Sequence, residues 1–322
     1  MASFFDLSRR GKLSFSGPQA LWFLDQLVTN KVVDLAAGAG AEALLLTPKG
    51  RIEAQMRILQ PVSEQVFVDL DTIEAGPVAD FFNGRVFATK VKVSDATADF
   101  GIIRLLGLDS AGLLERVIQL REVPDAEHEC ASFPEGFVAA LVRPAPGFDV
   151  WTQEGFTGEF VRRLEAAGAS ALTGAEYEDV RVAGGVPVYG TDYDDTFLPQ
   201  EAAMELAVHF QKGCYLGQEA VAMAQRGKIK RRLRHVIFDG PGGTGPMMYG
   251  QQNAGSVTSA GSFEGRWFGI ATVKTEVLPG EAISVRVGDN AYAGITRELP
   301  GTTHGPKVPS ARELRERLRG SA

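Results

Sequence analysis

The residues with the greatest chemical potential lie together between positions 209 and 219, in the run HFQKGCYLGQE. Gly213 and Gly217 flank Cys214 and allow a tight turn that a ligand can approach closely. Helix-forming residues follow from Gln218, so we expect a loop that enters a helix. Backbone N–H groups at a helix start, together with Lys212, favour an anion and would stabilise a thiolate at the cysteine. The alternative is a buried turn in which the cysteine packs as a small apolar side chain.

A strongly basic run follows this loop, with six basic residues in the nine positions from Arg226 to Arg234. In an extended strand, Lys228, Lys230 and Arg232 would lie on one face. Such a stripe could bind a polyglutamate tail or an RNA backbone. The alternative is a solvated edge strand whose charges protect it against aggregation.

Hydrophobic spacing and turn residues predict the elements that must position these side chains. A helix is expected from Pro18 to about residue 28, and Thr47-Pro-Lys-Gly50 separates two extended runs, which predicts a hairpin. Residues 86–93 are predicted to form a further strand. Thr173 and Glu176 have the spacing of a capping box, which predicts a helix over residues 177–183.

The carboxyl-terminal third has a different character. From about residue 228, short apolar runs alternate with Gly/Pro turns, which is typical of a small β-barrel or sandwich. Ser310 and Glu313 again have capping-box spacing, so a short terminal helix is expected.

Composition limits the possible function classes. The 322 residues are 44% hydrophobic and carry a net charge of -7, so the molecule as a whole is not an electrostatic nucleic-acid binder. Two cysteines and four scattered histidines cannot build a closed structural zinc or iron-sulfur site, and no metal is expected. The absence of a long apolar stretch argues against a membrane span, and we expect a cytoplasmic protein.

The octamer KGCYLGQE at residues 212–219 resembles the signature of YgfZ-type folate-binding proteins, which are relatives of the glycine-cleavage T-protein, an aminomethyltransferase. The similarity continues in RVAGGVPVYG at 181–190, LPQEA at 198–202 and LLTPKGRI at 45–52, and it covers most of residues 1–300. YgfZ-type proteins usually carry an arginine where this chain has Met223, so a cation expected near the motif is missing.

The resemblance implies an α+β fold shaped as a three-domain disc. Two interleaved α+β domains and a small carboxyl-terminal β-barrel would surround a channel for tetrahydrofolate. The implied first domain comprises residues 1–46 and 134–228 and carries the octamer. The second would comprise residues 47–133, and the barrel with its terminal helix residues 229–322.

The resemblance also suggests which residues contact folate. Glu201 matches an acidic position that faces the folate and could accept hydrogen bonds from the pterin amino group and a ring N–H. The alternative is a glutamate attracted to a helix start. Tyr193 and Phe210 could stack on folate rings, although such aromatic residues often belong to the core. T-proteins have an acidic pair near the reactive nitrogens of folate, and Glu53 is the only acidic residue in the matching stretch.

The function implied is binding of tetrahydrofolate, or a one-carbon derivative of it, in support of iron-sulfur cluster assembly or repair in client enzymes, including tRNA-modifying ones. Cys214 would be the key thiol, in a redox or one-carbon-accepting role, with Lys212 stabilising its thiolate. The remaining motif residues would hold the loop: Gly213, Tyr215, Gly217, Gln218 and Glu219. The first alternative is folate-dependent aminomethyl transfer, which the missing acidic pair disfavours. The second is a non-enzymatic scaffold that docks RNA or an acidic partner on the basic run.

Overall fold

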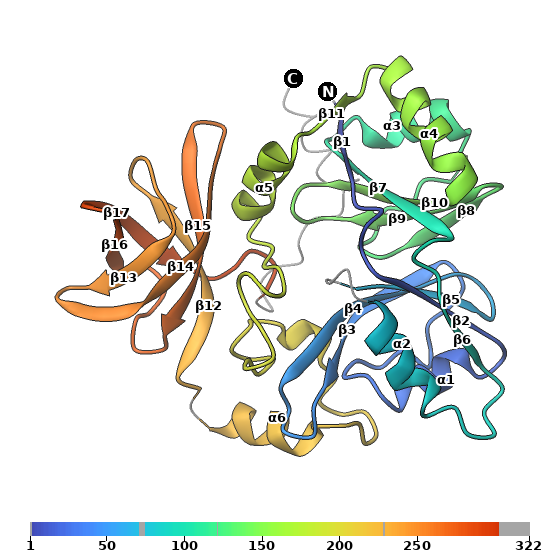
Figure 1. Ribbon diagram of the computed structural model, residues 1–322, viewed down its shortest axis with the longest axis horizontal. Helices are drawn as coiled ribbons and strands as arrows, with labels where there is room; N and C mark the ends of the chain where they lie inside the picture. Colours follow the sequence, from blue (N-terminus) through green and yellow to red (C-terminus); the bar gives the residue numbers. More distant parts are fainter. Residues whose placement is uncertain (1, 71–74, 121, 228, 303–322) are drawn as a thin grey trace.

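The computed structural model describes residues 2–70, 75–120, 122–227 and 229–302. Seen down its shortest axis, the described chain forms three lobes around a common centre (Figure 1). Two lobes are built on β-sheets with helices, and the third is a closed β-barrel. The α+β fold with a carboxyl-terminal barrel, expected from the sequence, is confirmed.

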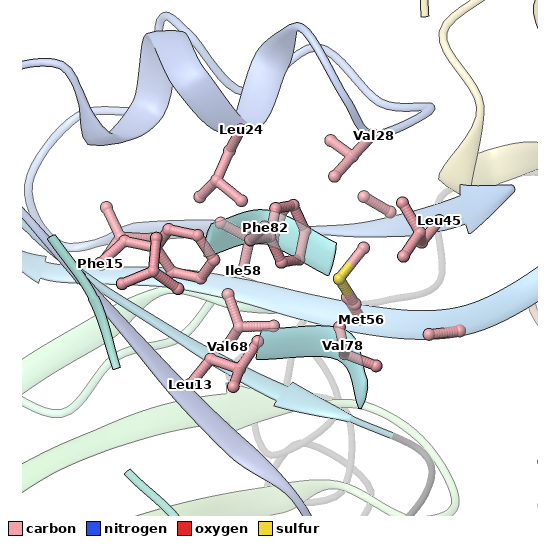
Figure 2. Packing of buried hydrophobic residues seen from close by; sticks show 14 of the residues in the cluster. Leu13, Phe15, Leu24, Val28, Leu45, Met56, Ile58, Val68, Val78 and Phe82 are labelled. Atoms are coloured by element: carbon pink, nitrogen blue, oxygen red, sulfur yellow. The ribbon is translucent and has the colours of Figure 1, made fainter. Parts of the chain in front are cut away.

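The first lobe contains a five-stranded sheet in the order β3-β4-β5-β2-β6. Helices α1 (Ala20–Asp25) and α2 (Ala75–Asn83) contribute buried side chains to its core. Figure 2 shows this packing, in which Leu24 of α1 and Phe82 of α2 lie over the apolar face of the strands. The strands are β2 (Lys12–Ser16), β3 (Ala39–Leu46), β4 (Ile52–Val62), β5 (Gln65–Leu70) and β6 (Lys92–Asp95).

The second lobe contains a six-stranded sheet in the order β11-β1-β7-β10-β9-β8. Helices α3 (Ser110–Ile118) and α4 (Glu154–Ala166) cover it with apolar side chains. Its strands are β1 (Ser3–Asp6), β7 (Phe100–Leu106), β8 (Cys130–Phe133), β9 (Gly136–Leu141), β10 (Gly147–Gln153) and β11 (Ser170–Ala171). A separate apolar cluster, which includes Leu59, Ile102 and Trp151, joins the two sheets.

The first sheet is nested within the second along the chain, because β1 precedes it and pairs with β7, which follows it. The sheets group the chain differently from the predicted domain ranges. The predicted boundary at residues 46 and 47 falls between β3 and β4, which pair with each other across the Thr47–Gly50 turn. The domain ranges themselves stay a prediction.

A connecting segment with α5 (Gly174–Ala183), the short 3-10 helix η1 (Glu205–Ala207) and α6 (Gln218–Arg226) leads to the barrel. The predicted capping box is present at the start of α5, where Thr173 and Glu176 bond reciprocally. Among the described helices, none has the length and apolarity needed to cross a membrane.

The barrel closes in the order β12-β15-β14-β13-β16-β17. Strand β12 pairs with β15 along its whole length but with β17 only from His235 onward, so the part of the basic run within β12, residues 231–234, has a neighbouring strand on one side. The terminal helix predicted from Ser310 lies outside the described residues. The barrel strands are β12 (Arg231–Phe238), β13 (Gly245–Tyr249), β14 (Gln252–Phe263), β15 (Arg266–Lys274), β16 (Ala282–Val287) and β17 (Asn290–Arg297).

The strand predicted over residues 86–93 is wrong for most of its length, since β6 begins only at Lys92. Turn hydrogen bonds occupy the preceding stretch, including one from the Val91 N–H to the Thr89 carbonyl. Ala88 has a φ of 49°, which an extended strand does not allow.

Candidate functional site

The octamer loop packs on the turn between β3 and β4, so two of the sequence motifs meet in space (Figure 1). Gly217 caps α6 with a φ of 81°, and a Cβ there would lie 2.5 Å from the Thr47 carbonyl oxygen. A Cβ on Gly50 would in turn lie 2.8 Å from the Cβ of Ala220. The glycines are therefore needed for close approach of two backbones, whereas the sequence suggested approach of a ligand.

Lys212 is a buried tether whose side chain is only 1% exposed. Its Nζ donates to the carbonyl oxygens of Asp25, Val28 and Asn30 at 2.5–3.0 Å. Burial lowers the pKa of Lys212, and attraction to Asp25 opposes that shift. All three ammonium donors are thus directed at the chain that follows α1, and the structure does not bring them to a thiolate.

Cys214 lies on the surface of the loop, and its thiol accepts no hydrogen bond from the described residues. Its neighbour Tyr215 is buried in the core between the lobes, while Glu219 is exposed in the first turn of α6. Gln218 is half-buried at the helix start. The loop therefore anchors itself through a lysine and a tyrosine and presents its cysteine outward.

A cavity of about 100 Å³ lies where the two sheets and the connecting segment meet the chain that follows the barrel. The first sheet contributes Gln55 and Arg57 of β4, and the second contributes Arg104 of β7. Residues 202–204, 206 and 207 of the connecting segment and the chain after β17 complete its walls. None of the octamer residues lines this cavity.

Tyr193 and Gln55 form a polar pair at the cavity. The buried Tyr193 hydroxyl donates to Gln55 Oε1 at 2.8 Å, and its ring packs edge-on against Tyr189 and Phe197. Gln55 Nε2 has no hydrogen-bond partner within the part of the chain that the structure describes. Tyr193 thus contacts the cavity wall through Gln55, and its ring packs as a core aromatic.

Glu53, two positions earlier on β4, is exposed and does not line the cavity. Sequence reasoning therefore missed Gln55, although strand alternation places residues 53, 55 and 57 on one face. Phe210 is 38% exposed and also lies away from the cavity wall.

Glu201 is buried beside the cavity, where its neighbours Ala202 and Ala203 form part of the wall. Its Oε2 accepts from the Leu198 N–H at 3.1 Å and from Arg51 at 3.3 Å, and it lies 3.5 Å from Arg231 Nε. The carboxylate thus lies between two cations, with one of its oxygens engaged.

A buried cluster of charge lies against the cavity between the two sheets. Arg57 bonds Asp69 through Nε and Nη2, and its Nη2 lies 2.6 Å from Asp149. Arg104 Nε and Nη2 each donate to one oxygen of Asp149 at 2.7 Å, and Arg10 Nη2 lies 3.1 Å from Asp69 Oδ1. Burial alone would raise the pKa of Asp149, but attraction to Arg104 and Arg57 holds it well below its usual range. We call these five residues the arginine wall.

His128 completes the polar lining. Burial lowers the pKa of His128, which keeps the imidazole neutral, and its buried Nδ1 has no hydrogen-bond partner among the described residues. Within the same described ranges, no group of three His, Cys, Asp or Glu side chains is placed to hold a metal ion.

Ion pairs engage the arginines of the basic run that lie in β12. Arg232 pairs with Glu205 and lies 3.6 Å from Glu298, which also pairs with Arg234. Lys230 is exposed just before β12, and Lys228 lies outside the described residues. The continuous cationic stripe predicted for one strand is therefore wrong, because the strand begins at residue 231 and its arginines face acidic partners.

The family model described as the GCVT N-terminal domain matches residues 1–212. The chain belongs to the GCVT family. The assignment to the superfamily of YgfZ-type proteins and T-proteins, made from the octamer and its companion segments, is thereby confirmed.

Curated relatives of this GCVT family member carry two kinds of name. An aminomethyltransferase of Rubrobacter xylanophilus is 26% identical over 297 residues, spanning 88% of this chain and 79% of the relative. The tRNA-modifying protein YgfZ of Serratia proteamaculans is 24% identical over 224 residues, spanning 69% and 66%. The crystal structure of aminomethyltransferase T from the Bartonella henselae glycine cleavage system superposes with a TM-score of 0.83 at 18% identity, covering 93% of this chain and 86% of that one. At that identity the likeness concerns the fold.

Proposed function

We propose that this GCVT family member binds tetrahydrofolate, or a one-carbon derivative of it, at the central cavity. We further propose that it supports iron-sulfur cluster assembly or repair in client enzymes, tRNA-modifying ones included. The observation that carries the proposal is Gln55 on the wall of a cavity between the two sheets, held by the hydroxyl of Tyr193, with Glu201 buried beside it.

The residues present fit a pterin. Gln55 Nε2 offers amide N–H donors toward the cavity, which suit carbonyl and ring-nitrogen acceptors. The carboxylate of Glu201 would accept from an amino group and a ring N–H, and apolar side chains such as Met56 and Leu141 flank the polar groups. When bound, tetrahydrofolate would supply nitrogens that can accept a one-carbon unit, and a one-carbon derivative would supply the unit itself.

Calorimetric titration with tetrahydrofolate under anaerobic conditions tests this binding. We expect saturable binding to the wild type and a loss of about tenfold or more in Glu201→Gln, because a charge-assisted acceptor becomes neutral. Glu159→Gln is the matched control, since Glu159 is an ion-paired carboxylate exposed on α4. Equal affinity in wild type and Glu201→Gln, or no binding at millimolar ligand, would count against the proposal.

The proposed role of Cys214 follows from its position. An exposed thiol on a rigidly anchored loop can react with a client protein, whereas one inside the cavity could not. Lys212 is then a positioning residue that fixes the loop through the Asp25, Val28 and Asn30 carbonyls.

Complementation of a deletion strain tests the cysteine. We expect Cys214→Ser to lose iron-sulfur enzyme activity in clients while the purified variant binds tetrahydrofolate normally. Cys130→Ala is the control for a buried thiol. Full complementation by Cys214→Ser would remove the cysteine from the mechanism.

Folate-dependent aminomethyl transfer is the second candidate, and the names of relatives such as the Rubrobacter enzyme favour it. Against it stands the exposed position of Glu53, which does not line the cavity, where the polar side chains of β4 are Gln55 and Arg57 and neither takes up a proton as a carboxylate does. A carboxylate is present on the cavity wall, but it belongs to Glu42 of β3. Production of methylene-tetrahydrofolate from an aminomethylated lipoyl carrier protein would decide for this candidate.

A further inference from the structure

Glu42 of β3 places a carboxylate on the wall of the central cavity. Its backbone carbonyl accepts from Asn30 Nδ2 at 2.7 Å, whereas no hydrogen bond or ion pair engages the carboxylate among the residues that the structure describes. Its cross-strand partner Arg57 belongs to the arginine wall and is held by Asp69 and Asp149 instead. Because the Glu42 side chain is only partly buried, a molecule in the cavity can reach its oxygens.

Gln55 is the diagonal neighbour of Glu42 on the same face of two strands that lie side by side (Figure 1). It pairs with Leu44, two residues along β3 from Glu42. Diagonal neighbours of an antiparallel pair lie about 7–8 Å apart, within reach of long side chains. The Tyr193 hydroxyl donates to Gln55 Oε1, which leaves Nε2 to donate into the cavity. The two strands therefore offer a ligand one donor and one acceptor next to each other.

Glu201 stands toward the other end of the same strands. Its Oε2 lies 3.3 Å from Arg51 Nη1, and Arg51 immediately precedes β4. Gln55 follows on β4, and then Arg57, which faces Glu42 across the strands. The order along the strands is therefore a carboxylate, an amide donor and a second carboxylate.

A tetrahydropterin presents the complementary order along one edge. Its 2-amino group and N3–H are donors, its C4 carbonyl is an acceptor, and the N5–H beside that carbonyl is again a donor. In a fully oxidised pterin N5 has a lone pair and no hydrogen. A 7,8-dihydropterin shares this unprotonated N5 but keeps a hydrogen on N8. An ionised carboxylate only accepts hydrogen bonds, so beside N5 it attracts the tetrahydro form and repels the other two.

We propose that Glu42 accepts the N5 hydrogen of a bound pterin and thereby makes the cavity selective for the tetrahydro oxidation state. This inference rests on the proposed function and deepens it, since it names the form of the ligand that the same site takes. Glu201 holds the amino edge and Gln55 the C4 carbonyl, which are groups that all three oxidation states share. Among folates the contact with Glu42 favours one with a hydrogen on N5, such as tetrahydrofolate itself.

Anaerobic calorimetric titration of the full chain with three probes measures this selectivity. The probes are 6-methyltetrahydropterin, 6-methyl-7,8-dihydropterin and 6-methylpterin, which share the amino edge and the C4 carbonyl. We expect the tetrahydro probe to bind about tenfold or more tightly than either of the others, because it has a hydrogen on N5. Dihydropterin binding as tight as tetrahydropterin binding would overturn the assignment to N5, since the hydrogen that these two probes share is on N8.

Two variants with the same chemical change separate the role of Glu42 from that of Glu201. Glu42→Gln replaces the carboxylate by an amide that donates as well as accepts, so the ratio of tetrahydropterin to oxidised-pterin affinity should fall about tenfold. Glu201→Gln should weaken all three probes alike and leave this ratio unchanged, because its contacts are the same in every oxidation state. A ratio that Glu42→Gln does not change, or that both variants change equally, would refute the inference. If Glu42→Gln does not fold in a thermal melt, the wild-type series still decides.

Failure of this inference is distinguishable from failure of the proposed function. If all three probes bind the wild type with equal affinity, the pterin site stands and the selectivity assigned to Glu42 is refuted. If neither the probes nor tetrahydrofolate bind at millimolar concentration, the folate proposal fails and the inference fails with it.

Discussion

Asp149 offers the sharpest test of the charge arrangement between the two sheets. Its side chain is fully buried, accepts two hydrogen bonds from Arg104 and forms an ion pair with Arg57. Asp149→Asn preserves its shape but removes the carboxylate charge that pairs with both Arg57 and Arg104. Breaking a buried ion pair from one side costs about 3–5 kcal/mol, which is a large part of the roughly 5–15 kcal/mol by which folded proteins are stable.

Urea denaturation at pH 7, followed by tryptophan fluorescence, measures this loss. Trp151 is a suitable reporter because it lies on the same strand as Asp149, is fully buried, and stacks on Phe137 with ring centroids 5.1 Å apart. Glu159→Gln, which breaks an exposed pair on α4, should change the free energy of unfolding by less than about 1 kcal/mol.

A double variant distinguishes two causes of the lost stability, the loss of the ion pair itself and the burial of an arginine left without a partner. Asp149→Leu combined with Arg104→Met removes one charge of each sign and leaves the net charge of the cluster as in the wild type, so it should recover most of the stability lost in Asp149→Asn. A loss below about 1 kcal/mol in Asp149→Asn, or a double variant less stable than the single one, would refute the reasoning.

Three further predictions concern other parts of the fold. Gly217→Ala should lower the free energy of unfolding by roughly 1–3 kcal/mol, because Gly217 has a positive φ and a Cβ there would meet the Thr47 carbonyl oxygen. Gly213→Ala should leave the unfolding free energy unchanged, since nothing lies within 4 Å of a Cβ at that position. Equal losses in the two variants, measured by thermal or chemical denaturation, would contradict this. In the native protein a thiol reagent should modify the exposed Cys214 rapidly and Cys130 only on unfolding, because burial raises the pKa of Cys130 to about 12. Rapid modification of both cysteines in the native protein would disprove this prediction. Burial lowers the pKa of Lys12 to about 8, below its value in the unfolded chain, so the unfolded chain binds more protons between about pH 8 and pH 10. The free energy of unfolding of the wild type should therefore rise relative to that of Lys12→Met as the pH increases over that range. A difference in unfolding free energy that does not change with pH would argue against a buried ammonium.

Local sequence signals predicted local structure well. The Thr47–Gly50 turn, the Thr173 capping box and the turn-rich barrel all depend on residues close together in the chain, and each is present. Residues 86–93 failed as a strand because an apolar run does not reveal that Ala88 must turn with a positive φ.

The candidate site was harder to predict because its contacts join distant segments. Lys212 was expected to face a thiolate, but its partners are backbone carbonyls more than 180 residues earlier, and a carbonyl has no signature in a sequence. The partners that neutralise Arg232 are Glu205 and Glu298, which only the fold brings near. Gln55 could have been found, since β-strand alternation from Glu53 points to it and to Arg57.

The nesting of one sheet inside another has a consequence for the order of assembly. During synthesis the strands between residues 12 and 95 can pair as soon as they emerge, whereas β1, made first, must wait for β7 and then for β11 before both of its edges are covered. Closing so long a loop is entropically expensive, so its pairing belongs to a late step of folding. Until residue 171 has been made, a nascent chain leaves one edge of β1 unpaired, and we expect that edge to be the part of this sheet most prone to non-native strand pairing.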